Sequence, residues 1–206
     1  KAAPEADDAS LLRRLTLDLA GRIPTEAEMR AYLASTDPEK RVKAVDRLVA
    51  SPGFARHQAN EFDAMMMAGT RGNLRDYLSR AFREDRPWDR IFREVVQADE
   101  SGTGGAGASQ FVKQRARDLD RLTSDVSTTF FGVNVSCAKC HDHPRVADWK
   151  QDHYYGLKTF FARTYLAGTF LAENDYGSVK FQTTKGEEKK ARPMFLTGRV
   201  IDLPDP

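Results

Sequence analysis

Apolar residues recur every three or four positions through most of the first 161 residues, which is the spacing of amphipathic helices. In the first such segment, Leu12, Leu15 and Leu19 repeat at this spacing. The pattern predicts about eight short helices, at roughly residues 10–19, 25–33, 37–49, 52–67, 74–82, 88–96, 119–131 and 152–161. In the third helix, the expected buried stripe consists of Val42, Val45, Leu48 and Val49.

Local signals mark where several of these helices begin and end. Thr25 and Glu28 stand three positions apart, as the two partners of a capping box do. Pro38 and Pro52 each follow a capping-type residue and take the first helical position, where proline is tolerated. Gly132 is well suited to end the helix before it, because glycine adopts the left-handed backbone of a C-terminal cap.

After Ala162 the pattern changes, and apolar and polar residues alternate as they do in a strand. Residues 177–183 form the expected strand, residues 185–186 offer a turn, and residues 194–196 are the expected return strand. The charged run 187–190 is interpreted as a solvated loop. The predicted fold class is therefore mainly α, with a small β-hairpin appendage near the C-terminus.

A glycine-rich stretch at residues 101–109 suggests a loop that cradles phosphate. A phosphate-binding loop of that kind is followed by Lys and then Ser or Thr, and this pair is absent here. We therefore interpret the stretch as a flexible loop.

The composition limits the class of protein. The 206 residues are 40% hydrophobic and carry a net charge of +2, which suits one domain, or one domain with an appendage. Such a balanced charge gives no argument for nucleic acid as a partner. No apolar run in the sequence approaches the length of a membrane span.

The chemistry of the chain is concentrated in the stretch Cys137-Ala138-Lys139-Cys140-His141, which contains the only two cysteines. This is the C-x-x-C-H pattern at which haem c is attached. Two thiols three positions apart can each bond to a vinyl group of one porphyrin, and the histidine that follows supplies the proximal ligand of the iron. We therefore predict one covalent haem c per chain, with the helices packed around it.

The C-x-x-C-H motif is also compatible with zinc, redox or structural-thiol chemistry. A structural zinc site needs four protein ligands, so two would have to come from the histidines at 57, 141, 143 and 153. A thioredoxin-like redox pair needs a βαβ context, which the sequence does not show. A simple structural disulfide across two intervening residues is the remaining alternative.

The second axial ligand decides between an electron carrier and a haem that binds small molecules. His143 lies too close to His141 along the chain to reach the opposite face of the same iron. We expect His143 either to lie near a haem propionate or carbonyl, or only to stabilise its loop. His57, in a separate helix, is the predicted distal ligand, and the Met65–Met67 cluster is the second choice. An open site is the third.

His153 lies far enough from His141 along the chain to reach the haem edge. Its neighbours Tyr154 and Tyr155 are alternative walls of the pocket. We include Tyr154 among the residues expected to contact the haem.

Nearly the whole chain resembles one family, the second type of planctomycete cytochrome c domain, a family of unknown function with one C-x-x-C-H motif. The resemblance lies in residues 8–24, 40–52, 86–89, 130–133, 137–144, 148–149, 154–157 and 160–161, and in a tail at residues 186–196. Arg145 departs from the pattern, because the family usually has an aromatic residue there, and this puts one contact to the haem edge in doubt. Such domains are common in large secreted proteins of Planctomycetes and relatives, and no reaction is established for them.

The resemblance implies a haem-bearing domain that is followed by further domains in a longer protein. We expect residues 1–165 to form the helical haem c domain and residues 166–206 to form an extended or β appendage of it. Because haem c is attached outside the cytoplasm, we expect a periplasmic or other extracytoplasmic location.

The predicted function is transfer of single electrons within or between envelope or secreted proteins, with a redox partner protein or an attached domain. One alternative is binding of small ligands, or catalysis, at an open distal site. Another is a structural or interaction module that haem or a metal staples together.

Overall fold

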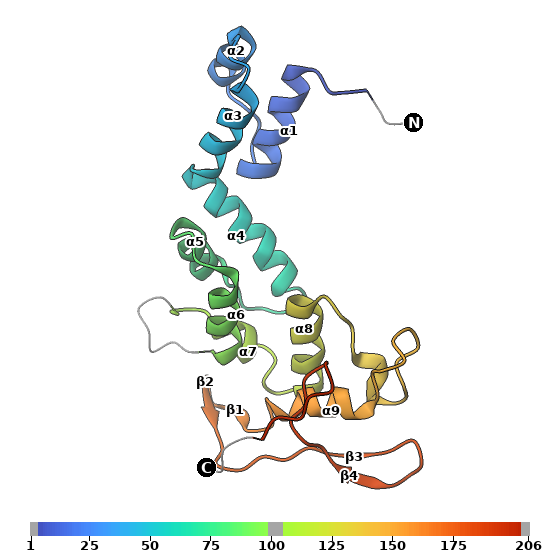
Figure 1. The fold of residues 1–206 in the computed structure, drawn as a ribbon. Helices are drawn as coiled ribbons and strands as arrows, with labels where there is room; N and C mark the ends of the chain where they lie inside the picture. The colour runs from blue at the N-terminus through green and yellow to red at the C-terminus, as the bar shows by residue number, and fades with distance from the viewer. Residues whose placement is uncertain (1–3, 99–104, 203–206) are drawn as a thin grey trace. The chain divides into compact units, whose positions relative to one another are not determined.

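The computed structural model describes residues 4–98 and 105–202, which form two compact units (Figure 1). The first unit comprises Lys1–Gly69 and Asn73–Ile91, and the second comprises Thr70–Gly72 and Phe92–Pro206. Nine α-helices and two small antiparallel hairpins lie within the described residues, with the hairpins near the C-terminus. The predicted fold class, mainly α with a small β element, is confirmed.

The first unit is helical in the part that the structure describes. Its helices are α1 (Asp8–Ala20), α2 (Glu26–Ala34), α3 (Lys40–Val49), α4 (Pro52–Met66), α5 (Arg75–Arg83) and the start of α6 (Trp88–Gln97). The predicted signals at α2 and α4 are confirmed: Thr25 and Glu28 form the capping box, and Ser51 caps α4 with Pro52 at its first position. Local side-chain hydrogen bonds therefore fix these helix starts.

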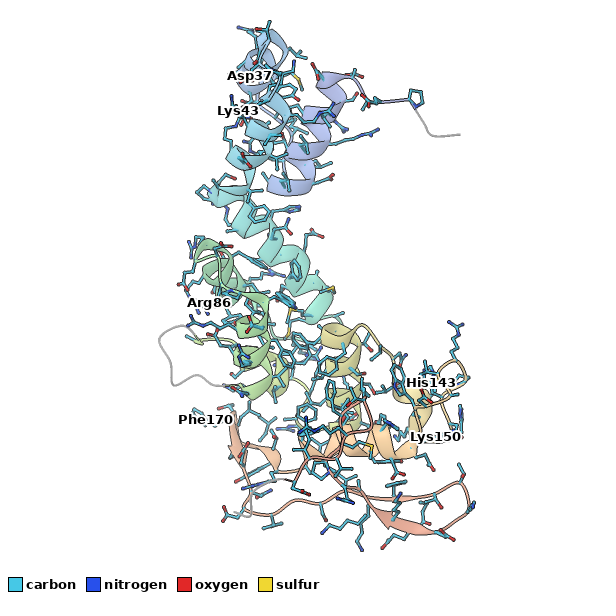
Figure 2. All side chains as sticks on the ribbon, in the orientation of Figure 1. Asp37, Lys43, Arg86, His143, Lys150 and Phe170 are labelled. Carbon is cyan, nitrogen blue, oxygen red and sulfur yellow. The ribbon has the colours of Figure 1, made fainter. Side chains whose placement is uncertain are left out.

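The predictions for α3 were wrong at its start and partly wrong on its buried face, where Leu48 is buried as predicted and Val45 is half-buried. The helix begins at Lys40 and not at Pro38, because the Asp37 carboxylate accepts from the Glu39 N–H at 2.8 Å and holds a turn there. The same carboxylate accepts from Lys43 Nζ at 2.6 Å (Figure 2).

The buried residues of α3 are Ala44 and Leu48, four positions apart on one face. Val42 is 61% exposed and Val49 is 44% exposed, because they lie off that face. The small Ala44 is buried with Leu12 and Tyr32, so a short side chain makes this helix contact, and Val42 and Val49 do not.

The second unit contains the rest of α6, α7 (Gln110–Lys113), α8 (Leu119–Phe131), the 3-10 turn η1 (Ser136–Lys139) and α9 (Gln151–Thr159). Gly132, with φ of +68°, ends α8 as predicted. The short helix α7 was not predicted. Residues 101–104 of the glycine-rich stretch lie outside the described residues, and residues 105–109 form the turn before α7.

Two hairpins follow α9, and the prediction for the second was partly wrong. Strand β1 (Thr164–Ala167) pairs with β2 (Phe170–Glu173), which was not predicted. Strand β3 (Lys180–Gln182) lies within the predicted strand, but it pairs with β4 (Glu188–Lys190), the run expected to be a loop. All three side chains of β4 are exposed, so charge is tolerated on this edge strand.

The chain after β4 returns to α9. Gly156 allows this approach, because a Cβ at that position would stand 2.5 Å from Met194 Cβ. Instead of a return strand, Met194 makes an isolated bridge with Val200.

The capping box at α2 predicts an acid-dependent stability. The Nη1 and Nη2 atoms of Arg22 each donate to the Glu28 carboxylate at 2.8 Å, and the Thr25 N–H donates to it as well. The bond from Arg22, helped by the Thr25 N–H, lowers the pKa of Glu28 from 4.5 to about 2. Because the pKa of Glu28 is lower in the folded than in the unfolded protein, its charged form stabilises the fold fully at pH values above the unfolded pKa. This stabilisation is lost as the pH falls from about 4.5 to about 2.

We expect Glu28→Gln to keep the cap but lose the ion pair, and so to lower the free energy of unfolding at pH 7 by about 0.5–1 kcal/mol. The difference from wild type should vanish near pH 2, as measured by urea unfolding over a pH series. Glu26→Gln, on the same helix with a largely exposed ion pair to Arg30, is the control and should change little. An equal pH dependence in wild type and Glu28→Gln would contradict the prediction.

Candidate haem attachment site

The C-x-x-C-H motif forms a tight turn directly after α8. Residues Ser136–Lys139 make the single 3-10 turn η1. The Cys137 carbonyl accepts from the N–H groups of both Cys140 and His141, each at 3.3 Å. The two cysteines and the histidine are therefore held within one short turn of backbone.

One residue of the turn faces the core, whereas the two cysteines and the histidine face solvent. Ala138 is fully buried in a cluster with Val135, Tyr154 and Leu157. Both cysteine thiols are free and exposed, and His141 is exposed too. The buried alanine thus anchors the turn to the core, while the groups expected to bond to haem lie at the surface.

One carboxylate, Asp120 in the first turn of α8, connects this turn to α9. Its Oδ2 accepts from Lys139 Nζ at 3.0 Å. Its Oδ1 accepts from the Tyr154 hydroxyl at 2.8 Å and from Lys158 Nζ at 2.7 Å. Partial burial works to raise the pKa of Asp120, but these three hydrogen bonds outweigh it and lower the pKa to about 2. Burial and then the bond to Asp120 raise the pKa of Tyr154.

The hairpin β3–β4 supports the turn from a second side. Gln151 Nε2 donates to the Lys139 carbonyl and to the Gln182 carbonyl, both at 3.2 Å. Its Oε1 accepts from the Thr184 N–H at 3.1 Å. One turn further along α9, Tyr155 stacks on Phe181 with ring centroids 4.2 Å apart. Residues after 165 therefore pack against the residues that hold the motif.

The hydrogen bonding of His141 leaves one ring nitrogen suited to a metal. Its Nδ1 lies 2.7 Å from the Asp142 carbonyl. A carbonyl only accepts, so Nδ1 is the protonated nitrogen of the neutral ring, in which Nε2 keeps its lone pair. No hydrogen bond to Nε2 occurs within residues 4–98 and 105–202. Two free exposed thiols and an unprotonated Nε2 are the donors that haem c requires, so the residues present fit the group.

His143 has both ring nitrogens engaged within its own loop. Nε2 donates to the Asn134 carbonyl at 3.1 Å, and Nδ1 accepts from the N–H groups of Arg145 and Val146 at 3.2 and 3.1 Å. The backbone N–H of His143 also donates to the Trp149 carbonyl, just before Lys150 leads into α9 (Figure 2). Of the two expected roles for His143, this geometry favours stabilisation of the loop.

The candidate distal ligands lie in the first unit, on α4 and just after it. The His57 ring packs over Gly21, where a Cβ would stand 2.6 Å from Nδ1. Met66 and Met67 are buried, whereas Met65 is exposed. The proposal that His57 supplies the distal ligand stays a prediction from the sequence. His153, in the second unit, accepts from the Lys150 N–H through Nδ1 and so caps the start of α9.

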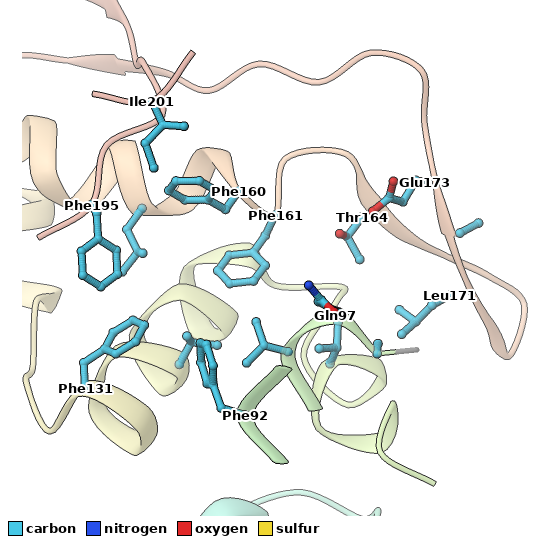
Figure 3. A pocket seen from close by; sticks show the side chains of 16 residues that line it. Phe92, Gln97, Phe131, Phe160, Phe161, Thr164, Leu171, Glu173, Phe195 and Ile201 are labelled. Atoms are coloured by element: carbon cyan, nitrogen blue, oxygen red, sulfur yellow. The ribbon is translucent and has the colours of Figure 1, made fainter. Parts of the chain in front are cut away.

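The second unit also holds an apolar cavity of about 660 Å³ (Figure 3). Phe92, Phe131, Phe161 and Phe195 point into it, and among its described lining residues none belongs to the motif. The nine residues of α9 span about 13 Å. Gln151 contacts the motif at one end of this helix, and Phe160 and Phe161 line the cavity just beyond the other end. Leu157 lines the cavity and also packs with Ala138 of the motif, so the cavity adjoins the cluster that anchors the turn.

Sequence reasoning missed the two residues that hold the turn. Asp120 had the pattern of an ordinary acidic residue in a first helical turn, and Gln151 that of a helix-start residue. Their partners lie up to 38 residues away, at Lys158 and in the hairpin. The only local signal was the spacing of Tyr154 and Lys158, which are four apart and so share one helix face.

Neither a ready-made metal cluster nor a membrane-spanning helix occurs in the described part of the chain. No group of three or more His, Cys, Asp or Glu side chains is placed there to hold a metal ion. None of the helices within these residues combines the length and the apolar character that a membrane span requires.

The family comparison covers most of this architecture. The model of a family described as "PSCyt2: Protein of unknown function (DUF1549)" matches residues 1–165. The chain belongs to this family. The match includes the whole C-x-x-C-H turn and α9, and it ends within β1, before the hairpin that supports the turn. Among the curated proteins and the solved structures, none matches the chain.

Burial of Ala138 predicts that the turn tolerates no larger residue there. Ala138→Leu should overpack the cluster with Tyr154 and Leu157 and lower the free energy of unfolding by about 1–3 kcal/mol. Urea unfolding measures the loss. Ala147→Leu, at an exposed position of the following loop, is the matched control and should leave the stability nearly unchanged. Equal losses in the two variants would contradict the assigned burial.

The hydrogen bonds of His143 predict a local effect. His143→Ala removes the acceptor of the Arg145 and Val146 amides, so both should exchange hydrogen faster than in the wild type, by about fivefold. Amides in the middle of α8 serve as the internal control and should keep their rates. Unchanged exchange at Arg145 and Val146 would show that the ring does not hold the loop.

Proposed function

We propose that the chain is a c-type cytochrome domain that binds one haem through Cys137 and Cys140, with His141 as the proximal ligand. The observation that supports this is the outward presentation of both thiols and of an unprotonated His141 Nε2 on one anchored turn. The domain transfers single electrons between envelope or secreted proteins, to a redox partner or to an attached domain.

The chain's own residues supply attachment and orientation. Each cysteine adds its sulfur to one carbon of a vinyl group and its hydrogen to the other, so attachment needs no oxidant and releases no leaving group. The Asp142 carbonyl accepts a hydrogen bond from His141 Nδ1–H, which fixes the ring orientation and makes Nε2 a stronger electron-pair donor to a metal. When bound, the haem supplies an iron that changes between the ferric and ferrous states.

The exposure of the motif favours electron transfer over a reaction at a buried site. Electron transfer needs a cofactor edge that a partner can approach, and the two cysteines and His141 lie at the surface of the second unit. A second axial ligand completes the low-spin iron of that role, and His57 is the ligand predicted for it.

A second function, binding of small ligands at an open haem face, has one observation in its favour. Both ring nitrogens of His143 are engaged, and Nδ1 of His153 is engaged too. Neither is free to close the distal face without breaking these bonds. An open face binds oxygen, carbon monoxide or peroxide.

Production in a host that attaches haem c tests the proposal. The intact mass should show one added haem, and the pyridine haemochrome spectrum should be that of two thioethers. Cys140→Ser should leave a single thioether, and the double serine variant at Cys137 and Cys140 should leave none. An unmodified wild-type mass from such a host, or zinc in place of iron, would reject the proposal.

The absorption spectrum of the loaded protein separates the two functions. A low-spin, six-coordinate spectrum supports electron transfer, and a high-spin spectrum that shifts with carbon monoxide supports ligand binding. His57→Ala should convert low-spin to high-spin iron if His57 is the distal ligand. An unchanged low-spin spectrum moves the assignment to Met65, Met66 and Met67, replaced one at a time.

A further inference from the structure

A turn of this kind needs support that its backbone does not supply. The 3-10 turn η1 has four residues, its first N–H donates to the Asn134 side chain, and the two hydrogen bonds that close it are 3.3 Å long. Short 3-10 turns have poor hydrogen-bond geometry and do not persist alone. Attachment of one porphyrin at two points nevertheless requires both thiols to stay on one side of the turn. Something outside the backbone must hold it.

We propose that Asp120 and Lys139 are positioning residues that hold the C-x-x-C-H turn in the shape that attaches haem at both cysteines. This inference rests on the proposed function and assigns a role to a variable position of the motif. Lys139 is tied at two atoms, because its Nζ bonds to Asp120 and its carbonyl accepts from Gln151. Ala138 beside it is buried, and the Lys139 side chain, which is 42% exposed, is held by its ion pair with Asp120. Cys137 and Cys140 are thereby left on the outside.

The charges at Asp120 explain why this carboxylate matters to the turn. It accepts from two ammonium groups, Lys139 and Lys158, as well as from the Tyr154 hydroxyl. Removal of its charge leaves two lysines close together with nothing to offset their repulsion. Of the two, Lys158 is fixed on α9, whereas Lys139 lies on the short turn and is the one free to move away. Loss of the Asp120 charge therefore acts on the motif.

The contact is separable from the packing of the helices. Tyr154 and Lys158 bond to the Asp120 carboxylate independently of Lys139, so α8 and α9 stay connected when Lys139 is removed. Lys139→Ala is therefore the decisive variant, and Asp120→Asn, which also weakens the helix contact, is the supporting one. Lys150→Ala is the matched control, because Lys150 forms a similar ion pair with Asp142 just outside the turn.

The first experiment uses the chain without haem. Hydrogen exchange should be faster by about threefold in Lys139→Ala than in wild type at the Cys140 and His141 amides, which close the turn. Lys139→Arg should restore the wild-type rates, and Lys150→Ala should keep them. Amides in the middle of α8 report whether the variant is folded and should not change. Unchanged exchange at Cys140 and His141 in Lys139→Ala overturns the inference.

The second experiment uses chain produced in a host that attaches haem c, and it measures the ratio of single to double thioether products by peptide mass spectrometry. The share of single attachment should rise about threefold in Lys139→Ala and in Asp120→Asn, and Lys139→Arg and Lys150→Ala should match wild type. Equal ratios in Lys139→Ala and wild type overturn the positioning role. A wild-type chain that takes no haem rejects the proposed function instead, and the exchange rates alone then decide whether Asp120 and Lys139 hold the turn.

Discussion

The arrangement of the second unit depends on one carboxylate shared by three donors. Asp120 has about four lone-pair positions, and the hydroxyl of Tyr154 and the ammonium groups of Lys139 and Lys158 use three of them. Its pKa of about 2 keeps it charged over the whole physiological range. Because the donors come from a turn and a helix that follow α8, folding of all three segments is coupled. A charge-assisted bond of this kind orients groups as well as stabilising them.

Helices were predictable where the determining interactions are local. Thr25 and Ser51 bond to backbone within three residues, so the sequence contains both partners of each cap. The errors arose where packing or pairing partners lie further away. Val42 is apolar but faces solvent, because Ala44 makes the helix contact. Glu188 and its neighbours are charged yet form a strand, because backbone pairing to β3 does not require apolar side chains.

The site divides in the same way. Cys137, Cys140 and His141 were proposed from their spacing alone, because covalent attachment of haem c requires that spacing. The hydrogen bonds of His143, Asp120 and Gln151 join residues up to 38 positions apart, and no periodic pattern in the sequence predicts them. Sequence therefore indicated which atoms we propose to bond to haem, and tertiary structure was needed to see what holds them. The role predicted for His57 is tested by neither, because His57 belongs to the first unit and the motif to the second.

Gly156 shows that the segment matched by the family model is not the same as the segment that packs together in the structure. It lies inside the family match, but its missing side chain makes room for Met194, which lies outside the match. Tyr155 stacks on Phe181 across the same border. A version trimmed at residue 165 would expose these surfaces of α9 to water and free Gln151 from the hairpin. The smallest unit worth expressing or grafting is therefore set by what covers α9 and extends well past the boundary of the family match.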